Sequence, residues 1–376
     1  MNILYIGSIG SSTAISGGYE FISKSMDKIF KELNEDEIIT NYTSIDLNGK
    51  IQSVEVLCEQ YDIGIILTHP ISFKSQNFKN NIIKLKNKCN KFYLHVFWEV
   101  SKFPKSWDWL FDKDETIFNG FISSSDYVSN LLGNRINNNQ KIFKIRPYIK
   151  EEEYKDYKID KLKKIDEKIF NVLYVGQYTK RKGMEDAIIA FTRAFSDKTD
   201  CSLTLKYHRL SNIECDEHEM IKRTIAMNCE SFKPKIYEIT DNLNKDQIFE
   251  MYSNASCLLF PSRGEGFGLP IMETGIVGLP IIYANNSSCS EVVGKNTIER
   301  ITCKLDEATG MSHYGYEKGS EYGIPNMSEM IESLEYFYSI WKDDKTIYYK
   351  FDDEDRNFIF EKYGKQNVTN DIVALF

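Results

Sequence analysis

Short apolar runs alternate with longer amphipathic stretches along the first 150 residues of the chain. Apolar runs of about four to eight residues, rich in β-branched and aromatic side chains, are typical of strands, whereas apolar residues three and four positions apart are typical of helices. The predicted strands are Ile3–Ile9, Tyr61–Thr68, Phe92–Phe97 and Phe118–Ser123. The predicted helical segments are Tyr19–Leu33, Ile71–Lys88 and Tyr127–Leu132. Such alternation predicts a parallel sheet that binds ligands at the carboxyl ends of its strands.

The pattern restarts after residues 150–168, a charged segment that is typical of a solvated connection between domains. The predicted strands of the second half are Phe170–Val175, Ser202–Tyr207, Lys235–Ile239, Cys257–Pro261 and Pro280–Tyr283. The predicted helices are Gly183–Phe195, Lys245–Tyr252, Pro270–Val277, Asn326–Trp341 and Asp353–Phe376. We therefore expect an α/β protein with one parallel sheet in residues 1–150 and a second in residues 151–352.

Length and charge add a constraint on the partners of the protein. The 376 residues carry 47 basic and 55 acidic side chains, a net charge of −8, and their number suits two domains. Residues 1–150 hold 18 basic and 16 acidic side chains, whereas residues 151–376 hold 29 and 39. A general nucleic-acid binder needs a basic surface to neutralise phosphates, so no nucleic-acid partner is expected.

The cysteines and the N-terminus indicate the compartment. Eight cysteines are scattered without a C-x-x-C pair, which argues against a zinc site and against a secreted disulfide framework. The N-terminus starts directly in a strand pattern without the features of a signal peptide. No apolar run approaches the roughly 18 residues that span a bilayer. We expect a cytoplasmic protein with reduced thiols.

The first candidate site lies in residues 172–184, where a predicted strand ends at Gly176 and a helix begins near Gly183. Lys180, Arg181 and Lys182 stand between them. Cations oppose the helix dipole at a helix N-terminus, whereas a bound polyanion makes the same arrangement favourable. A solvated basic turn is the alternative. The position between strand and helix in an acidic domain favours a phosphate site.

The second candidate site is the glycine-rich loop in residues 259–273, which leads from a buried strand into a helix. Pro270 is typical of a first helical turn, where backbone N–H groups have no intrahelical acceptor. Glu265 in the loop can accept hydrogen bonds from hydroxyl groups. Glu273 can face the same cleft, or it can simply complement the helix dipole. A hydrolase would use the two glutamates as an acid/base pair, but the neighbouring phosphate site disfavours that reading.

These motifs give the second half a resemblance to the donor-binding domain of GT-B glycosyltransferases, in the large retaining family 4. The family pattern is a strand, a glycine and a basic loop ending in K-G, followed later by P-S-x-x-E-G-F-G-L-P-x-x-E and G-x-P-[IV]-I. This chain matches it with Pro261-Ser262, Glu265 to Pro270, Glu273 and Gly278 to Ile282. The resemblance covers most of residues 169–294. It implies two Rossmann-like domains that face across a cleft, with a helix of about residues 353–376 crossing back to the first domain.

The resemblance also implies a site for a nucleoside-diphosphate sugar. Arg181 and Lys182 would clamp the diphosphate, Glu273 would accept from the ribose hydroxyls, and Glu265 would lie beside the donor sugar. Many members carry Arg directly after the glycine, where this chain has Gln177, so the clamp would depend on Arg181 and Lys182. The further predicted donor contacts are Gly17 and Gly18, in a pair that is also typical of a plain turn, and Gly176, Gln177, Gly266, Phe267, Gly268 and Leu269.

The first half resembles the family more loosely, through Trp98-Glu99 and the Pro and Trp that follow in a W-E-x-x-x-x-P-x-x-W stretch. An aromatic ring beside a carboxylate suits an acceptor sugar, and Glu99 is a further catalytic candidate. A buried Trp with a structural Glu is the alternative. His69 and His95 end predicted strands near the same edge and complete the predicted acceptor side.

Residues 78–91 are basic and partly amphipathic, so they are a candidate for a weak peripheral membrane contact. A solvated helix is the plainer alternative.

The resemblance predicts transfer of a sugar from a nucleoside-diphosphate sugar to a hydroxyl of a glycan, lipid-linked or other acceptor, with retention of configuration. No cofactor is expected, and no metal, because the donor loops hold no D-x-D triad. A nucleotide-sugar epimerase or phosphorylase of the same fold, or a catalytically silent nucleotide-sugar-binding scaffold, are the alternatives. Residues 207–209 and 239–241 are candidates to contact the base, but their types do not decide among UDP, GDP and ADP.

Overall fold

The structure is a computed structural model. It describes residues 1–10, 17–46, 60–68, 72, 75–113, 116–160, 164, 167–208, 217–294, 298–309, 316–349 and 354–376.

The chain divides into two compact units. Unit 1 consists of Met1–Lys150, Ala308–Ser320 and Glu361–Phe376, and unit 2 consists of Glu151–Glu307 and Glu321–Phe360. The first segment of unit 1 ends at the residue where the sequence places the connection between domains. From the sequence, residues 151–352 are instead expected in one domain and residues of about 353–376 in the other.

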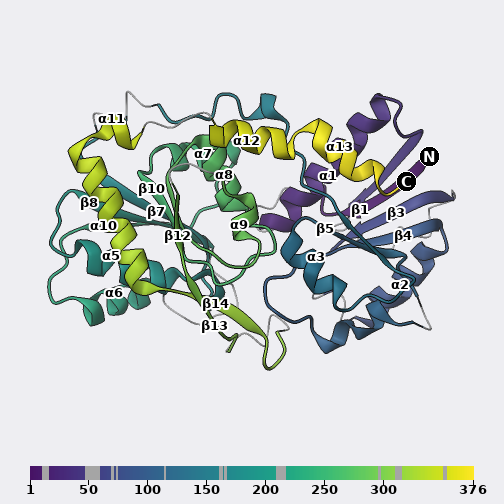
Figure 1. The fold of residues 1–376 in the computed structure, drawn as a ribbon, viewed down its shortest axis with the longest axis horizontal. Helices are drawn as coiled ribbons and strands as arrows, with labels where there is room; N and C mark the ends of the chain where they lie inside the picture. The colour runs from purple at the N-terminus through teal and green to yellow at the C-terminus, as the bar shows by residue number, and fades with distance from the viewer. Residues whose placement is uncertain are drawn as a thin grey trace. The chain divides into compact units, whose positions relative to one another are not determined.

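Unit 1 contains a six-stranded sheet whose neighbouring strands are all parallel. The strands are β1 (Asn2–Gly7), β2 (Asn41–Asp46), β3 (Tyr61–Leu67), β4 (Cys89–His95), β5 (Gly120–Ser123) and β6 (Lys141–Lys144). Their order is β2-β1-β3-β4-β5-β6 (Figure 1). The direction of the strand order reverses between β1 and β3, which is where sheets of this type place a ligand crevice.

The helices of unit 1 connect these strands. They are α1 (Gly17–Glu35), α2 (Gln76–Lys86), a 3-10 helix (Lys105–Phe111) and α3 (Asp126–Gly133). The basic stretch 78–91 forms most of α2 and the start of β4. Ser75 caps α2 by accepting a hydrogen bond from the N–H of Phe78, and Phe78, Ile82 and Leu85 are buried. This inward packing accounts for the amphipathic pattern, as the plainer alternative expects.

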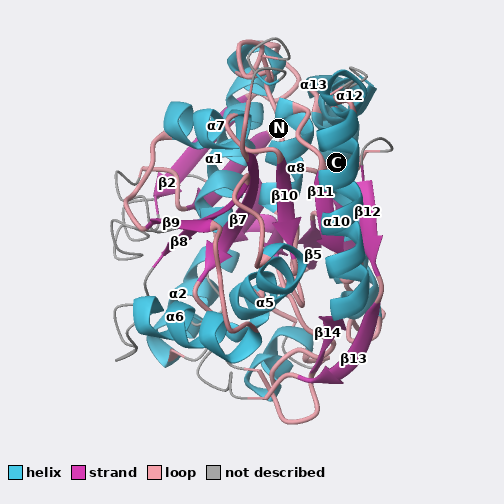
Figure 2. Ribbon diagram, turned by 90° about the vertical axis from the view of Figure 1, so that its left-hand side faces the viewer, coloured by secondary structure: helices cyan, strands magenta, loops and turns pink. Residues whose placement is uncertain are grey.

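Unit 2 contains a second six-stranded parallel sheet. The strands are β7 (Phe170–Gln177), β8 (Cys201–His208), β9 (Lys235–Ile239), β10 (Cys257–Phe260), β11 (Ile281–Ala284) and β12 (Ile298–Ile301). Figure 2 shows them in the order β9-β8-β7-β10-β11-β12. The chain builds outward from β7 to β9 and then returns to start again at β10, so the switch point lies between β7 and β10.

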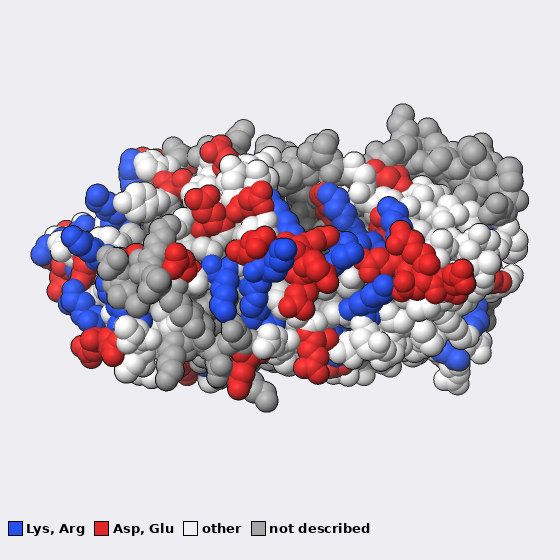
Figure 3. Space-filling view, turned by 90° about the horizontal axis from the view of Figure 1, so that it is seen from above, with Lys and Arg blue, Asp and Glu red and all other residues white. Residues whose placement is uncertain are grey.

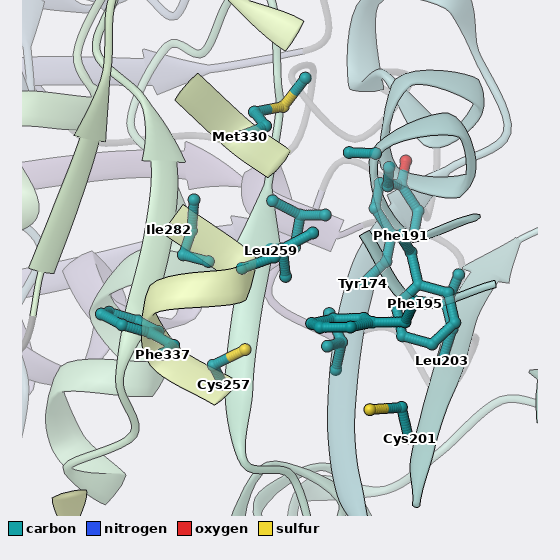
Figure 4. Packing of buried hydrophobic residues seen from close by; sticks show 14 of the residues in the cluster. Tyr174, Phe191, Phe195, Cys201, Leu203, Cys257, Leu259, Ile282, Met330 and Phe337 are labelled. Atoms are coloured by element: carbon teal, nitrogen blue, oxygen red, sulfur yellow. The ribbon is translucent and has the colours of Figure 1, made fainter. Parts of the chain in front are cut away.

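Helices cover both faces of the second sheet. They are α5 (Met184–Phe195), α6 (Glu217–Asn228), α7 (Lys245–Ser253), α8 (Leu269–Val277), α9 (Cys289–Val292), α10 (Met327–Asp343) and α11 (Lys345–Tyr348). A 3-10 turn (Lys180–Lys182) precedes α5, and an antiparallel hairpin is formed by β13 (Cys303–Glu307) and β14 (Glu321–Pro325). The apolar core on one face joins the sheet to α5 and α10 through residues that include Tyr174, Phe191, Phe195, Leu203, Leu259, Met330 and Phe337 (Figure 4).

The C-terminal segment forms two helices, α12 (Glu354–Tyr363) and α13 (Lys365–Val373), where the sequence predicts one. Gly364 interrupts them in an extended conformation. In unit 2, the Arg356 guanidinium of α12 donates to three backbone carbonyls, those of Tyr154, Tyr157 and Ile276. In unit 1, Arg146 forms two hydrogen bonds of 2.7 Å with Asp371 of α13.

Acidic and basic side chains are intermixed on the surface that Figure 3 shows. Within the described ranges, no helix is both long and apolar enough to cross a membrane.

Candidate active site

Both predicted donor motifs lie at the carboxyl ends of the two strands that flank the switch point of unit 2. The basic turn follows β7, and the glycine-rich loop follows β10. The two loops are joined through their backbones, because the N–H of Arg263 donates to the carbonyl of Arg181 over 2.7 Å. The topology therefore brings together two motifs that are about 80 residues apart, at the place where α/β sheets bind ligands.

Gly183 explains the K-G sequence at the start of α5. Its backbone is left-handed, with φ of +69°, and a Cβ atom there would lie 2.4 Å from the carbonyl oxygen of Pro261. Only glycine adopts this conformation without strain and also permits so close an approach. Thr179 caps the preceding turn by accepting a hydrogen bond from the N–H of Lys182. These features fix the direction of the Arg181 and Lys182 side chains.

Arg181, Lys182 and Glu265 form a buried ion cluster, which we call the cation cluster. Lys182 Nζ lies 2.5 Å from Oε1 of Glu265, and Arg181 Nη1 lies 3.6 Å from Oε2. The Ser262 hydroxyl also donates to Oε1 of Glu265, and Arg181 donates to the carbonyl of Gly264. Arg181 and Glu265 are only 7% and 6% exposed. The structure thus brings together three of the four predicted catalytic residues.

The charge state of Glu265 follows from its neighbours. Burial by itself would raise the pKa of this carboxyl, but the charges of Lys182 and Arg181 and the hydrogen bonds from Lys182 and Ser262 outweigh burial and lower the pKa. Glu265 is therefore a carboxylate at neutral pH. A buried carboxylate paired with two cations leaves the site with excess positive charge, which suits a ligand with more than one negative charge.

The loop that carries Glu265 is held by a segment after β11 that the sequence motifs do not include. Ser287 Oγ accepts a hydrogen bond from the N–H of Glu265, and the Ser288 hydroxyl donates to its carbonyl. Asn286 donates to the carbonyl of Ser262. The position of Asn-Ser-Ser shortly after a predicted buried strand is the signal that could have pointed to these residues.

The second half of the loop leads into α8. Gly268 precedes the helix with φ of +96°, and Phe267 is buried. The helix begins at Leu269, with Pro270 in its first turn. The N–H groups of a first turn lack intrahelical acceptors and carry the positive end of the helix dipole, so they favour an anionic ligand. Together with the cation cluster they define a site with two independent sources of positive potential.

Glu273 lies about one turn into α8 and does not belong to the cation cluster. Its Oε2 accepts a hydrogen bond of 2.8 Å from the hydroxyl of Tyr252 on α7. The side chain keeps some solvent exposure, yet the surrounding protein raises the pKa of its carboxyl to about 7 through desolvation, against the opposing hydrogen bond from Tyr252. Tyr252 is a contact that the sequence motifs do not identify.

Gly176 and Gln177 end β7 as predicted. A Cβ atom on Gly176 would lie 2.6 Å from the hydroxyl of Tyr174 and 3.3 Å from Cβ of Lys182, so a glycine is required for this packing. Gln177 pairs with His208 of β8 in the sheet.

In unit 1, the predicted glycines lie at the start of α1. Gly17 is the first residue of this helix, and a Cβ atom on Gly18 would meet nothing within 4 Å. The helix follows the loop after β1, at the switch point of the first sheet. His69 lies outside the described residues. His95 ends β4, where burial lowers its pKa to about 3 and its Nε2 lies 3.0 Å from Ser124 Oγ.

The predicted aromatic platform of unit 1 is buried. Trp98 is 1% exposed, packs against Trp107 and Phe103, and donates its indole N–H to the carbonyl of Lys102. Tyr316 lies edge-on to Trp98 with ring centroids 5.3 Å apart. The expectation of an open aromatic surface is therefore wrong for Trp98 in this structure, and the buried alternative describes it, because its ring is enclosed by other aromatic rings.

Glu99 keeps partial exposure beside this aromatic cluster. The hydroxyl of Tyr316 donates to its Oε2 over 3.3 Å. A carboxylate that still reaches solvent can accept a further hydrogen bond, so Glu99 remains a candidate for contact with an acceptor.

The described parts of the chain hold no group of three or more His, Cys, Asp and Glu side chains that could bind a metal ion.

Comparison with known proteins identifies the domain that carries the cation cluster. Residues 156–304 match the family described as "Glycosyl transferases group 1". Serotype-specific mannosyltransferase WbdA of Escherichia coli is 28% identical over 112 residues, or 29% of this chain. The matched segment spans only 13% of that relative's length.

Two solved structures resemble the whole chain. HepE of Anabaena, in complex with UDP and glucose, has a TM-score of 0.63 at 13% identity over 100% of this chain and 99% of that one. Sucrose-phosphate synthase of Thermosynechococcus elongatus has a TM-score of 0.65 at 11% identity, over 100% and 98%. At these identities the likeness concerns the fold. Residues 156–304 thus match the glycosyl transferases group 1 family, and the two Rossmann-like units of the chain have the GT-B fold.

Proposed function

We propose that this protein transfers a sugar from a nucleoside-diphosphate sugar to a hydroxyl group of an acceptor, with retention of anomeric configuration and without a metal ion. The observation that carries the proposal is the cation cluster of Arg181, Lys182 and Glu265 at the switch point of unit 2. The cluster lies in a family domain whose other members are glycosyl transferases.

The cation cluster suits the departure of a diphosphate. When the bond between the sugar C1 and the diphosphate oxygen breaks, negative charge grows on that oxygen. Arg181, Lys182 and the first-turn N–H groups of α8 are positioned to stabilise this charge in a site with little water, where electrostatic stabilisation is strongest. Two fixed cations supply the role that a metal ion would otherwise have, which supports a metal-independent reaction.

The two glutamates bear on the route to the retention that the resemblance implies, and they favour a route without a covalent sugar intermediate. Glu265 is engaged by Lys182 and Ser262, and Glu273 is bonded to Tyr252, so neither is presented as a nucleophile for a covalent sugar intermediate. In the reaction that we propose, the acceptor oxygen bonds to C1 on the face that the diphosphate leaves. The acceptor proton passes to the departing phosphate oxygen, which balances the step.

Three nucleotide sugars are tested first as donors. The relative WbdA is named a mannosyltransferase, and HepE was solved with UDP and glucose. We propose to test the binding of GDP-mannose, UDP-glucose and ADP-glucose by the rise in unfolding temperature, since a ligand at 100 times its Kd adds about 2.7 kcal/mol to the stability. The best donor is then incubated with glycan and lipid-linked acceptors. We propose the cytoplasm as the compartment, where such donors are available.

The product mixture decides between this proposal and its alternatives. We expect transfer only with an acceptor, a product with the same anomeric configuration as the donor by proton NMR, and full activity in EDTA. Inversion or a strict need for Mg²⁺ or Mn²⁺ would contradict those parts of the proposal. An epimerase would convert the donor without an acceptor, a phosphorylase would need inorganic phosphate, and a silent scaffold would bind the donor without turnover.

A further inference from the structure

Lys206 is a buried cation at the carboxyl end of β8. Its side chain is only 5% exposed, and its Nζ has no hydrogen-bond partner in the part of the chain that the structure describes. Burial lowers the pKa of this ammonium, and the charge of Asp241 opposes that effect. Taking an ammonium out of water without a bonded partner costs free energy. A ligand with an acceptor atom near Lys206 would reduce that cost.

The direction of the Lys206 side chain follows from strand alternation. Leu203 and Leu205 of β8 belong to the apolar core that faces α5 and α10, and Figure 4 shows Leu203 beside Phe191 and Phe195. Successive strand residues point to opposite faces, so Lys206 points to the other face of the sheet. On that face two further β8 side chains find a shared partner, since Ser202 and Thr204 both donate to Oδ1 of Asn171.

The face that Lys206 occupies is the face of the candidate donor site. Crossovers in parallel sheets are right-handed, so the helices before and after the switch point lie on opposite faces. α5 follows β7 and covers the core face, whereas α7 and α8 flank β10 and cover the other face. Lys206 therefore shares a face with Tyr252 on α7 and Glu273 on α8.

The sheet register places Lys206 one strand from the basic turn. Lys206 pairs with Val175 of β7, and β7 ends two residues later at Gln177. Neighbouring strands are about 4.8 Å apart. A nucleotide whose diphosphate lies at the β7–β10 switch point can extend over the end of β7, away from β10. Its base then lies over the end of β8, where Lys206 is buried.

We propose that Lys206 contacts the nucleobase of the donor and selects uracil or guanine, which have a carbonyl at C4 of the pyrimidine or C6 of the purine, against cytosine and adenine, which have an amino group there. An ammonium offers three donors and no acceptor. Uracil and guanine present a carbonyl oxygen where cytosine and adenine present an amino donor. A carbonyl oxygen accepts from the buried ammonium, whereas an amino group leaves it unpaired. This inference rests on the proposed function, because it assigns the base in the same donor site.

The test compares nucleotides that differ at this group and in the proton on the adjacent ring nitrogen. UDP is compared with CDP, and IDP with ADP, by titration calorimetry on the full chain, with inorganic pyrophosphate as the probe of the diphosphate site. We expect wild-type protein to bind the carbonyl member of at least one pair about 10-fold or more tightly, the scale of a hydrogen bond to a charged group. In Lys206→Met this preference should disappear while pyrophosphate affinity is unchanged. Lys235→Met is the matched control. Lys235 is exposed on the neighbouring strand β9, where it pairs with Ser202, four residues before Lys206 on β8.

Stability gives a second measurement on the same variants. Lys206→Met removes a buried charge, so its unfolding temperature without nucleotide should equal or exceed that of the wild type. A clear fall would indicate that Lys206 is bonded within the protein and would overturn the inference. An unchanged base preference in Lys206→Met, or an equal loss of its affinity for all four nucleotides and pyrophosphate, would also overturn the inference. In those cases nucleotide binding by the wild type leaves the proposed function standing, whereas a wild type that binds no nucleotide and no pyrophosphate refutes both.

Discussion

Lys182 Nζ lies 2.5 Å from Oε1 of Glu265, although the two residues are 83 positions apart in the chain. The bond joins the loop after β7 to the loop after β10. The same carboxylate pairs with two cations, because Arg181 contacts its other oxygen. The diphosphate site that we propose is thus organised around Glu265 as much as around its basic residues.

Lys182→Ala should lower kcat/KM for sugar transfer. The expected loss corresponds to about 2–4 kcal/mol of transition-state stabilisation, the scale of one lost electrostatic donor. Steady-state kinetics with the best donor provide the measurement. Lys180→Ala is the matched control, since Lys180 lies in the same turn with an exposed side chain. Equal rates for wild type and Lys182→Ala would remove Lys182 from the site.

Glu265→Gln should have opposite effects on the binding of an anion and on the stability of the protein. The variant leaves Arg181 and Lys182 without their carboxylate, so inorganic pyrophosphate should bind more tightly by calorimetry. The same change should lower the free energy of unfolding by several kcal/mol, because two cations lose a buried partner. Weaker pyrophosphate binding would show that Glu265 positions the cations more than it competes with the anion.

The Glu265 carboxylate also predicts a pH dependence of stability. Its folded-state pKa is lowered, so its stabilising contribution is present above the ordinary glutamate pKa of 4.5 and is lost as the pH falls below that value. The free energy of unfolding of the wild type, measured with urea, should therefore fall as the pH falls below that value. Glu265→Gln should show a smaller loss over the same range, and an equal loss in both proteins would contradict the assignment.

The contribution of Glu273 to stability should depend on pH with the opposite sign. Its pKa is raised from 4.5 to about 7, so the native state holds a proton more firmly, and stability from this group falls as the pH rises between those values. If the carboxylate accepts from ribose hydroxyls, donor affinity should instead rise as the pH passes through about 7. Glu273→Gln should flatten both profiles. A wild-type donor affinity that is independent of pH from 6 to 8 would contradict the ribose contact.

Gly183→Ala should destabilise the protein and weaken nucleotide binding together. A non-glycine residue in the left-handed region costs about 1–2 kcal/mol, and the new Cβ would also meet the Pro261 carbonyl oxygen at 2.4 Å. Thermal unfolding and nucleotide titration measure the two effects. Gly18→Ala is the stability control, because its Cβ would meet nothing within 4 Å and alanine favours a helix. A similar loss of stability in both variants would argue against this explanation.

Trp98→Ala should act on stability. The side chain is enclosed by aromatic rings, so its removal should cost about 3–5 kcal/mol in the free energy of unfolding. Glu99→Gln should leave stability nearly unchanged and raise the KM for the acceptor if Glu99 contacts it. An acceptor KM that responds to Trp98→Phe, with stability unchanged, would restore the aromatic platform.

The sequence predicts the parallel α/β class, which the structure and its likeness to solved GT-B proteins confirm. It succeeds where the signal is local. β10 and β11 are buried throughout and have continuous apolar runs, and the residues around Gly183 and Pro270 mark helix starts. The strands that it misses include β2 and β13, whose polar, partly exposed sequences lack such runs, and it merges α12 with α13.

The sequence by itself therefore determines the buried apolar strands, and that Arg181, Lys182, Glu265 and Glu273 lie in loops or helix starts at strand ends. The reason is that hydrophobic periodicity and turn chemistry act over a few residues. Only the tertiary structure decides that Glu265 joins the two cations whereas Glu273 joins Tyr252. Tertiary packing also encloses Trp98 and buries Lys206, because burial and long-range pairing depend on which distant elements meet, and sheet order determines that.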